Sequence, residues 1–125
     1  MVAAYLWLNA LVYAAFSLWC TVRPAQTAAA SGYLTLDASG RSEYLVVYGG
    51  LQVGIAAFYA LLALTPDLHR LGLLFSLAIY TAIVGYRVVT VLLFRPVSGV
   101  TLAIGAMEIA LLIAAVLLWM LRRPL

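Results

Sequence analysis

The sequence predicts an all-α membrane protein whose four transmembrane helices form one up-down antiparallel bundle. Of its 125 residues, 67% are hydrophobic and only 9% are charged, which is too few charges to cover the surface of a soluble domain. The apolar residues gather in four runs, each close to the roughly 20 residues that cross about 30 Å of hydrocarbon. Two of the three connections are short, so the helices that they join must be antiparallel neighbours. We therefore expect a single four-helix transmembrane domain over residues 1–125.

The first helix is expected at residues 2–22, and it ends at Arg23-Pro24. Its apolar run is longer than the core of a usual secretory signal and no basic residue precedes it, so we expect a retained helix. The first loop, residues 23–41, is the longest connection. Within it, the segment from Pro24 to Ala30 suits a short helix at the membrane surface. This loop is also the only connection long enough to cover one end of the bundle.

The remaining helices are expected at residues 43–64, 67–94 and 99–121. Thr65 is expected to cap the third helix, with Pro66 at its first position and Asp67 near the positive end of its dipole. Gly50 and Gly54 form a GxxxG pattern, which allows two helices to approach closely. We expect that pattern to serve packing inside the bundle rather than dimerisation.

Aromatic and basic residues mark the two membrane faces. The aromatic residues are typical of interfacial belts, with Tyr5, Trp7, Tyr59 and Trp119 at one face and Trp19, Tyr44 and Phe94 at the other. The net charge of +3 comes from Arg without any Lys. The positive-inside rule gives a tie, because one face carries Arg23, Arg41 and Arg95 and the other carries Arg70, Arg122 and Arg123. The compact pair Arg122-Arg123 leads us to place both ends of the chain in the cytoplasm. The Arg-only, Ala- and Leu-rich composition suggests a GC-rich bacterial genome, so we expect the bacterial inner membrane.

Two charged residues interrupt the apolar runs. Arg87 lies within the third run and Glu108 lies near the middle of the fourth. An isolated ionised side chain at this depth costs roughly 2.5–3.5 kcal/mol, so each is expected to face the interior and find a partner. At 1.5 Å per residue, both lie about 10–12 Å below the same membrane face. The antiparallel geometry therefore predicts an Arg87–Glu108 ion pair.

The second helix adds polar residues to the same half of the bundle. Glu43 is expected at its mouth, and Tyr48 and Gln52 share one helix face because they are four residues apart. Tyr13 and Tyr86 are expected to line the same cavity, whereas Asn9 lies nearer the other face and stands alone. The candidate ligand-binding residues are therefore Glu43, Tyr48, Gln52, Arg87 and Glu108. A plainer interpretation is that the ion pair only clamps helix register, with Gln52 and Tyr48 as interhelical hydrogen-bond partners.

Metal, redox and nucleic-acid chemistry are not indicated. The single cysteine, Cys20, cannot form a redox pair or a four-ligand zinc site, and we expect it to face lipid or core. His69 has no second histidine nearby and is expected to be a solvated interfacial residue. No phosphate-binding loop, nucleophile motif or basic-aromatic groove occurs, so we expect no metal, no evident cofactor and no nucleic-acid partner.

The stretch GRSEYLVVYGGLQVG, from Gly40 to Gly54, resembles an uncharacterised family of small bacterial four-helix integral membrane proteins near the DoxX-like group. The resemblance covers nearly the whole chain, including Arg-Pro after the first helix, an Arg in the third and a Glu in the fourth. It implies a link to membrane oxidoreductase assemblies and to quinone or thiol redox metabolism, although this chain has no redox cysteine pair.

Three functions are consistent with the sequence. The leading hypothesis is a module that binds or moves a small amphipathic or lipid-like ligand, such as a lipid or a quinone, in a polar intramembrane pocket. The first alternative is an accessory subunit of a larger membrane complex, or a homo-oligomer, in which the ion pair is structural. The third is a membrane enzyme in which Glu108 transfers a proton under the influence of Arg87. Sequence favours a non-enzymatic role among these.

Overall fold

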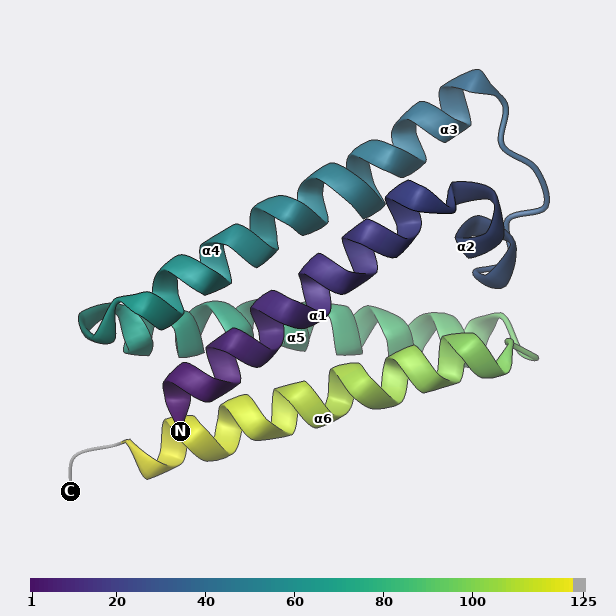
Figure 1. The fold of residues 1–125 in the computed structure, drawn as a ribbon. Helices are drawn as coiled ribbons and strands as arrows, with labels where there is room; N and C mark the ends of the chain where they lie inside the picture. The colour runs from purple at the N-terminus through teal and green to yellow at the C-terminus, as the bar shows by residue number, and fades with distance from the viewer. Residues whose placement is uncertain (123–125) are drawn as a thin grey trace.

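The computed structural model describes residues 1–122 of the chain, and it confirms the predicted fold class. Four helical units are long and apolar enough to cross a membrane: Val2–Val22, Ala38–Leu64, Pro66–Leu93 and Gly99–Leu121. No strand occurs within residues 1–122. The helices are α1 (Val2–Val22), α2 (Pro24–Ala30), α3 (Ala38–Leu45), α4 (Gln52–Leu64), α5 (His69–Leu93) and α6 (Gly99–Leu121) (Figure 1). Arg123, which contributed to the predicted charge tie, lies outside the described residues.

The second span is one continuous helix that contains a π-helical segment, Val46–Leu51, between α3 and α4. It begins at Ala38 rather than at residue 43, because the Asp37 side chain caps it by accepting a 2.7 Å hydrogen bond from the Gly40 backbone N–H. In the π segment, the Gly49 carbonyl accepts a 2.8 Å hydrogen bond from the Ser17 hydroxyl of α1. π-Helical turns of this kind occur frequently at functional sites.

Thr65 stands at the expected N-cap position of the third span, but the expected capping by its side chain is wrong. Thr65 makes no capping hydrogen bond, and its hydroxyl instead donates to the Leu61 carbonyl at 3.0 Å, which closes the end of α4. Pro66–Leu68 forms a short 3₁₀ turn, and α5 begins only at His69. Proline still stands at the start of the helical unit, because it supplies no backbone N–H that would need a partner there.

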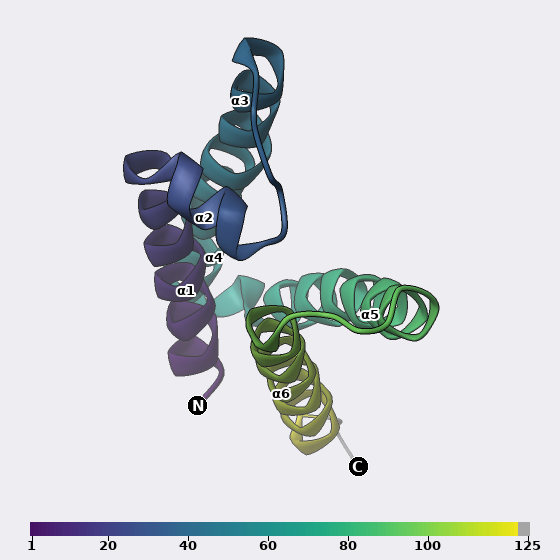
Figure 2. The same ribbon diagram turned by 90° about the vertical axis from the view of Figure 1, so that its right-hand side faces the viewer.

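The bundle consists of two antiparallel helix pairs that diverge from a shared end. α1 packs chiefly along α4, and α5 packs chiefly along α6. Figure 2 shows α5 and α6 splayed away from α1, α3 and α4. All four spans meet where α1 begins and α6 ends, and we call this the closed end (Figure 1). At the other end, the open end, α1 packs with α2, α3 and the π-helical segment, and Cys20, Ala28 and Tyr44 form a small buried cluster.

The closed end contains a buried core in which polar groups are paired. Its buried residues come from all four spans: Val2, Tyr5, Leu6, Ala10, Tyr59, Leu62, Ala63, Leu73, Tyr80, Leu111 and Ala115. Asn9 is fully buried there and accepts a hydrogen bond from the Tyr80 hydroxyl, so the expectation that Asn9 stands alone is wrong. Its amide also donates to the Tyr5 carbonyl at 2.8 Å. The Tyr80–Asn9 bond joins α5 to α1, and the bond to Tyr5 lies within α1.

Three further residues occupy other positions than expected. Tyr5 and Tyr59 are core residues rather than parts of an interfacial belt, because their hydroxyls find partners inside, at the Leu111 carbonyl (3.0 Å) and the Ser76 hydroxyl (2.9 Å). His69 is buried rather than solvated, and its Nε2 lies 3.2 Å from the Ala63 carbonyl. A carbonyl can only accept, so this nitrogen carries the proton.

The GxxxG pattern does not serve packing inside the bundle. A Cβ atom added at Gly50 or at Gly54 would meet nothing within 4 Å, and both residues are exposed. Gly49 makes the close approach instead, because an added Cβ there would lie 2.9 Å from the Thr21 hydroxyl oxygen of α1. The two open glycines therefore lie on the outer surface of the second span.

Candidate functional site

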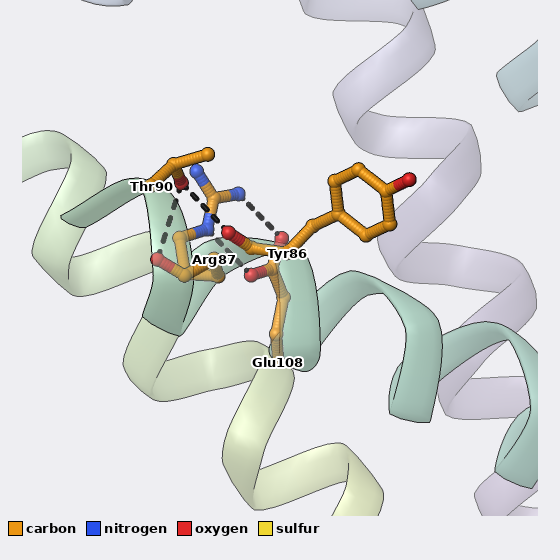
Figure 3. A network of polar contacts seen from close by, with 4 residues as sticks. All are labelled: Tyr86, Arg87, Thr90 and Glu108. Atoms are coloured by element: carbon orange, nitrogen blue, oxygen red, sulfur yellow. Dashed lines mark hydrogen bonds and ion pairs between the residues drawn. The ribbon is translucent and has the colours of Figure 1, made fainter. Parts of the chain in front are cut away.

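An ion pair joins the α5–α6 helix pair near the open end. The Arg87 guanidinium donates from Nε to Glu108 Oε2 at 2.9 Å and from Nη2 to Glu108 Oε1 at 2.8 Å. This bidentate arrangement matches the planar fork of Arg to both carboxylate oxygens, and it is visible in Figure 3. The Glu108 side chain is 11% exposed, whereas the Arg87 side chain is 31% exposed. The carboxylate is thus enclosed, and part of the guanidinium is open.

Gly105 allows the arginine to lie across α6. It stands one turn before Glu108, and a Cβ atom added there would lie 3.3 Å from Arg87 Cγ and 3.5 Å from Arg87 Cδ. A larger residue would displace the arginine stem and disturb its alignment with the carboxylate. Sequence reasoning missed this role. The available signal was a glycine three residues before an intramembrane acid, on the same helix face.

The two helix pairs enclose a cavity of about 600 Å³ on the side of the ion pair. It is lined by residues of all four spans and of the first loop: Val12, Tyr13, Phe16, Ser31, Tyr33, Tyr48, Gln52, Tyr80, Ile83, Arg87, Thr90, Phe94, Val100, Thr101, Ile104, Met107 and Glu108. Arg87 and Glu108 are the only charged residues in this lining. The site therefore combines mostly apolar and aromatic walls with one neutralised ion pair.

The structure brings four of the five sequence-predicted site residues to this cavity. Tyr48, Gln52, Arg87 and Glu108 line it, together with Tyr13. Glu43 does not line it, and its side chain is exposed on α3. Because the helix begins at Ala38, Glu43 also lies beyond the first turn, where the helix dipole would stabilise an acid.

Tyr86 is also absent from the cavity, contrary to expectation. Its side chain is 78% exposed, and its ring points away from the ion pair (Figure 3). Thr90 shares the lining but its hydroxyl is used within α5, where it donates to the Tyr86 carbonyl at 2.8 Å and to the Arg87 carbonyl at 3.2 Å. Such back-bonding to the preceding turn is common for helical threonine.

A group of three tyrosines connects the first loop to the second span over the open end. The Tyr44 and Tyr48 rings stack with their centroids 4.6 Å apart, and Tyr33 meets Tyr44 edge-on at 6.0 Å. The hydroxyls of Tyr33 and Tyr48 lie 3.4 Å apart. Sequence reasoning placed Tyr48 in the site but missed Tyr33, because a loop residue gives no periodic signal. Tyr33 and Ser31 make the loop part of the cavity wall.

Cys20 is fully buried next to this tyrosine group. The rate at which its thiol reacts therefore measures how well the group shields it. The Tyr44 hydroxyl contacts Cys20 Sγ at 3.6 Å and the Thr27 hydroxyl oxygen at 2.9 Å. Replacing Tyr33 with alanine removes an aromatic contact worth about 0.5–1.5 kcal/mol and should speed thiol labelling of Cys20 by roughly 2- to 10-fold. Labelling with a small maleimide measures this rate. Tyr33→Phe keeps the ring and serves as the control; equal rates in both variants would contradict the loop contact.

The described residues offer no metal centre. No group of three or more His, Cys, Asp or Glu side chains lies together within residues 1–122. Both Glu108 oxygens already accept hydrogen bonds from Arg87. The geometry suits recognition of a polar group by hydrogen bonding, beside apolar walls that suit a hydrocarbon portion.

Comparison with known proteins gives a family but no function. The sequence matches the family described as "Domain of unknown function (DUF4345)" over residues 1–121, nearly the whole chain. No curated protein and no solved structure matches the chain. The chain belongs to the DUF4345 family.

Proposed function

We propose that this member of the DUF4345 family binds or moves a small amphipathic or lipid-like molecule inside its membrane-spanning bundle. The observation that supports this proposal is the cavity of about 600 Å³ in which an ion pair is the only charged feature. That volume lies within the range of about 300–1,000 Å³ typical of small-molecule sites. Arg87, Glu108, Tyr48 and Gln52 would contact the polar end of the molecule, and residues such as Ile104 would contact its apolar part.

The divergence of the helix pairs supports access from the lipid. α4 and α5 pack together near the turn that joins them at the closed end, where the Tyr59 and Ser76 hydroxyls lie 2.9 Å apart. The described residues of the open end form no core that unites all four spans (Figure 2). In this proposal, a hydrocarbon chain would enter the cavity of about 600 Å³ from between the two pairs. The partners we propose are the bilayer and a lipid or a quinone, the latter suggested by the DoxX-like resemblance.

Filling the cavity tests the proposal without touching its polar groups. Ile104→Trp projects a large ring into the cavity, whereas Ile113→Trp adds the same ring at a position of α6 that is 53% exposed. Native mass spectrometry of protein extracted gently from membranes should show a bound amphiphile in the wild type and in Ile113→Trp. Ile104→Trp should lose most of it while the helical circular dichroism stays unchanged. Equal occupancy in the two tryptophan variants, or no bound mass at all, would contradict ligand binding.

The alternative is an accessory subunit of a larger membrane complex, or a homo-oligomer. The observation that favours it is the outer surface, where Gly50 and Gly54 are open and Tyr86 exposes its phenol within a membrane-spanning helix. Open glycines allow another helix to approach closely, and a phenol in hydrocarbon gains from a partner. A second membrane protein that co-purifies in fixed ratio, and is lost in Gly50→Leu/Gly54→Leu, would support this function. An enzyme that uses Glu108 for proton transfer is the third candidate.

We also propose that both ends of the chain face the cytoplasm of a bacterial inner membrane. The start of α1 and the end of α6 lie at the same end of the bundle, as an even number of spans requires (Figure 1). Arg70 and Arg122 lie on that side, and Arg23, Arg41 and Arg95 lie on the other. A phosphatase reporter fused after α6 should be inactive, because it is active only outside the cytoplasm. Strong phosphatase activity would reverse the orientation.

A further inference from the structure

The charge of the cavity limits what can bind in it. Arg87 and Glu108 are its only charged lining residues, and they neutralise one another at 2.8 Å. An anion that contacts the guanidinium would also lie close to the Glu108 carboxylate, and a cation that contacts Glu108 would lie close to Arg87. Placing a net charge in apolar surroundings is costly unless it is fully paired. The site therefore disfavours both ions.

The ion pair leaves one edge of the arginine free to donate hydrogen bonds. Its Nε and Nη2 each donate to Glu108, while Nη1 donates to no group within residues 1–122. No buried side-chain nitrogen or oxygen in the described part of the chain lacks a partner, so Nη1 is not sealed inside the protein. The exposed 31% of the Arg87 side chain is consistent with this open edge. A ligand atom that accepts hydrogen bonds could pair with the Nη1 donors of Arg87.

Three other polar side chains of the lining support the same conclusion. The hydroxyls of Tyr80 and Thr90 already donate to protein acceptors. The Gln52 side chain lines the cavity and makes no hydrogen bond within residues 1–122. A primary amide carries no charge and can both donate and accept, so it matches an uncharged polar group.

On the premise of the proposed function, we infer that the ligand is uncharged where it meets the ion pair, and that it presents a hydrogen-bond acceptor to the Nη1 edge of Arg87. An ester or amide carbonyl on a hydrocarbon chain has this chemistry. A phosphate, sulfonate or quaternary ammonium head does not. Glu108 thus acts as the residue that sets specificity, because it cancels a charge that would otherwise attract anions.

Three probes with the same 16-carbon chain test this inference: methyl palmitate, hexadecanesulfonate and hexadecyltrimethylammonium. Binding is measured to the wild-type protein in phosphatidylcholine nanodiscs, with Ile104→Trp as the blocked control and Ile113→Trp as its match. We expect methyl palmitate to bind at least about tenfold tighter than either ion, because a buried net charge is costly. In Glu108→Gln, the arginine keeps its charge, and hexadecanesulfonate should become the tightest of the three probes.

The outcomes separate the two proposals. Wild-type protein that binds hexadecanesulfonate or the ammonium probe as tightly as methyl palmitate, with Ile104→Trp blocking the binding, would overturn this inference and leave the proposed function standing. Equal binding of every probe to wild type and Ile104→Trp would overturn the proposed function itself. The relative affinities of the three probes for the wild-type protein decide the inference even where Glu108→Gln does not fold, because measuring them requires no change in the ion pair.

Discussion

Replacing Arg87 alone with methionine is expected to destabilise the folded bundle by about 3–5 kcal/mol, the usual effect of leaving one partner of a buried pair uncompensated. We expect a value within that range, because the carboxylate that loses its partner, Glu108, has a side chain that is only 11% exposed. Glu108→Leu should cost at least as much, since it leaves the arginine charge without a counter-ion in an apolar cavity. Reversible unfolding in mixed micelles, followed by circular dichroism, measures both changes.

The double variant Arg87→Met/Glu108→Leu distinguishes a clamp from a site. Well-packed apolar residues often replace a buried ion pair without loss of stability, so the double variant should recover most of the stability lost in either single variant. It should nevertheless bind the amphiphile much more weakly, because the guanidinium that would contact the polar end is gone and only uncharged groups such as Tyr48 and Gln52 remain there. A double variant with wild-type stability and wild-type binding would show that the pair is only a structural clamp.

Glu43→Leu provides the matched control for removal of an acid. Glu43 is exposed and outside the cavity lining, and surface substitutions of this kind usually change stability by less than about 0.5 kcal/mol. We therefore expect neither unfolding nor binding to change measurably. A large loss of binding in Glu43→Leu would show that Glu43 contributes to the site and that the ligand extends beyond the cavity lining towards α3.

The second large effect is expected at Gly72, where α5 meets α1 in the closed end. A Cβ atom added there would lie 2.8 Å and 2.9 Å from the two terminal carbons of Leu6. Leu6 is fully buried, so it cannot rotate into open space. Gly72→Val should therefore force the two helices apart and cost about 1–3 kcal/mol, as overpacking of a dense core usually does. The same unfolding measurement applies.

Gly85→Val is the matched control in the same helix. An added Cβ at Gly85 meets nothing within 4 Å, and the residue is exposed. Both variants carry the same propensity change from glycine to valine, so the difference between their unfolding free energies isolates the steric effect at Leu6. Equal destabilisation of the two variants would contradict close packing between α1 and α5 at the closed end.

Hydropathy alone predicts the spans well because the physical constraint is strong. A segment that crosses hydrocarbon must be apolar over about 20 residues, and it must satisfy its backbone hydrogen bonds internally. Four such runs in 125 residues leave little choice of architecture. The ends are harder to predict, because local hydrogen bonds decide them: Asp37 moves the start of the second span to Ala38, and Thr65 closes α4 instead of starting the next helix.

The ion pair could also be predicted, since charged residues in a membrane must find partners and short turns set equal depths. The depth of a residue in the membrane, however, says little about which way its side chain points. Glu43 and Tyr86 lie at suitable depths, yet both side chains are exposed outside the cavity. Gly105 and Tyr33 are uncharged and give no periodic signal in the sequence. Their roles in the site are therefore evident only from the contacts that they make.

The sequence by itself determined the number of spans, their antiparallel order and the depth at which Arg87 and Glu108 meet. Only the tertiary structure decided that the helices form two diverging pairs, and that Asn9 and Tyr80 join them at the closed end. The reason is that, in a membrane, the side of a helix facing lipid is as apolar as the side facing the core. Periodicity therefore cannot orient each helix about its axis, and interhelical packing and hydrogen bonding do so instead.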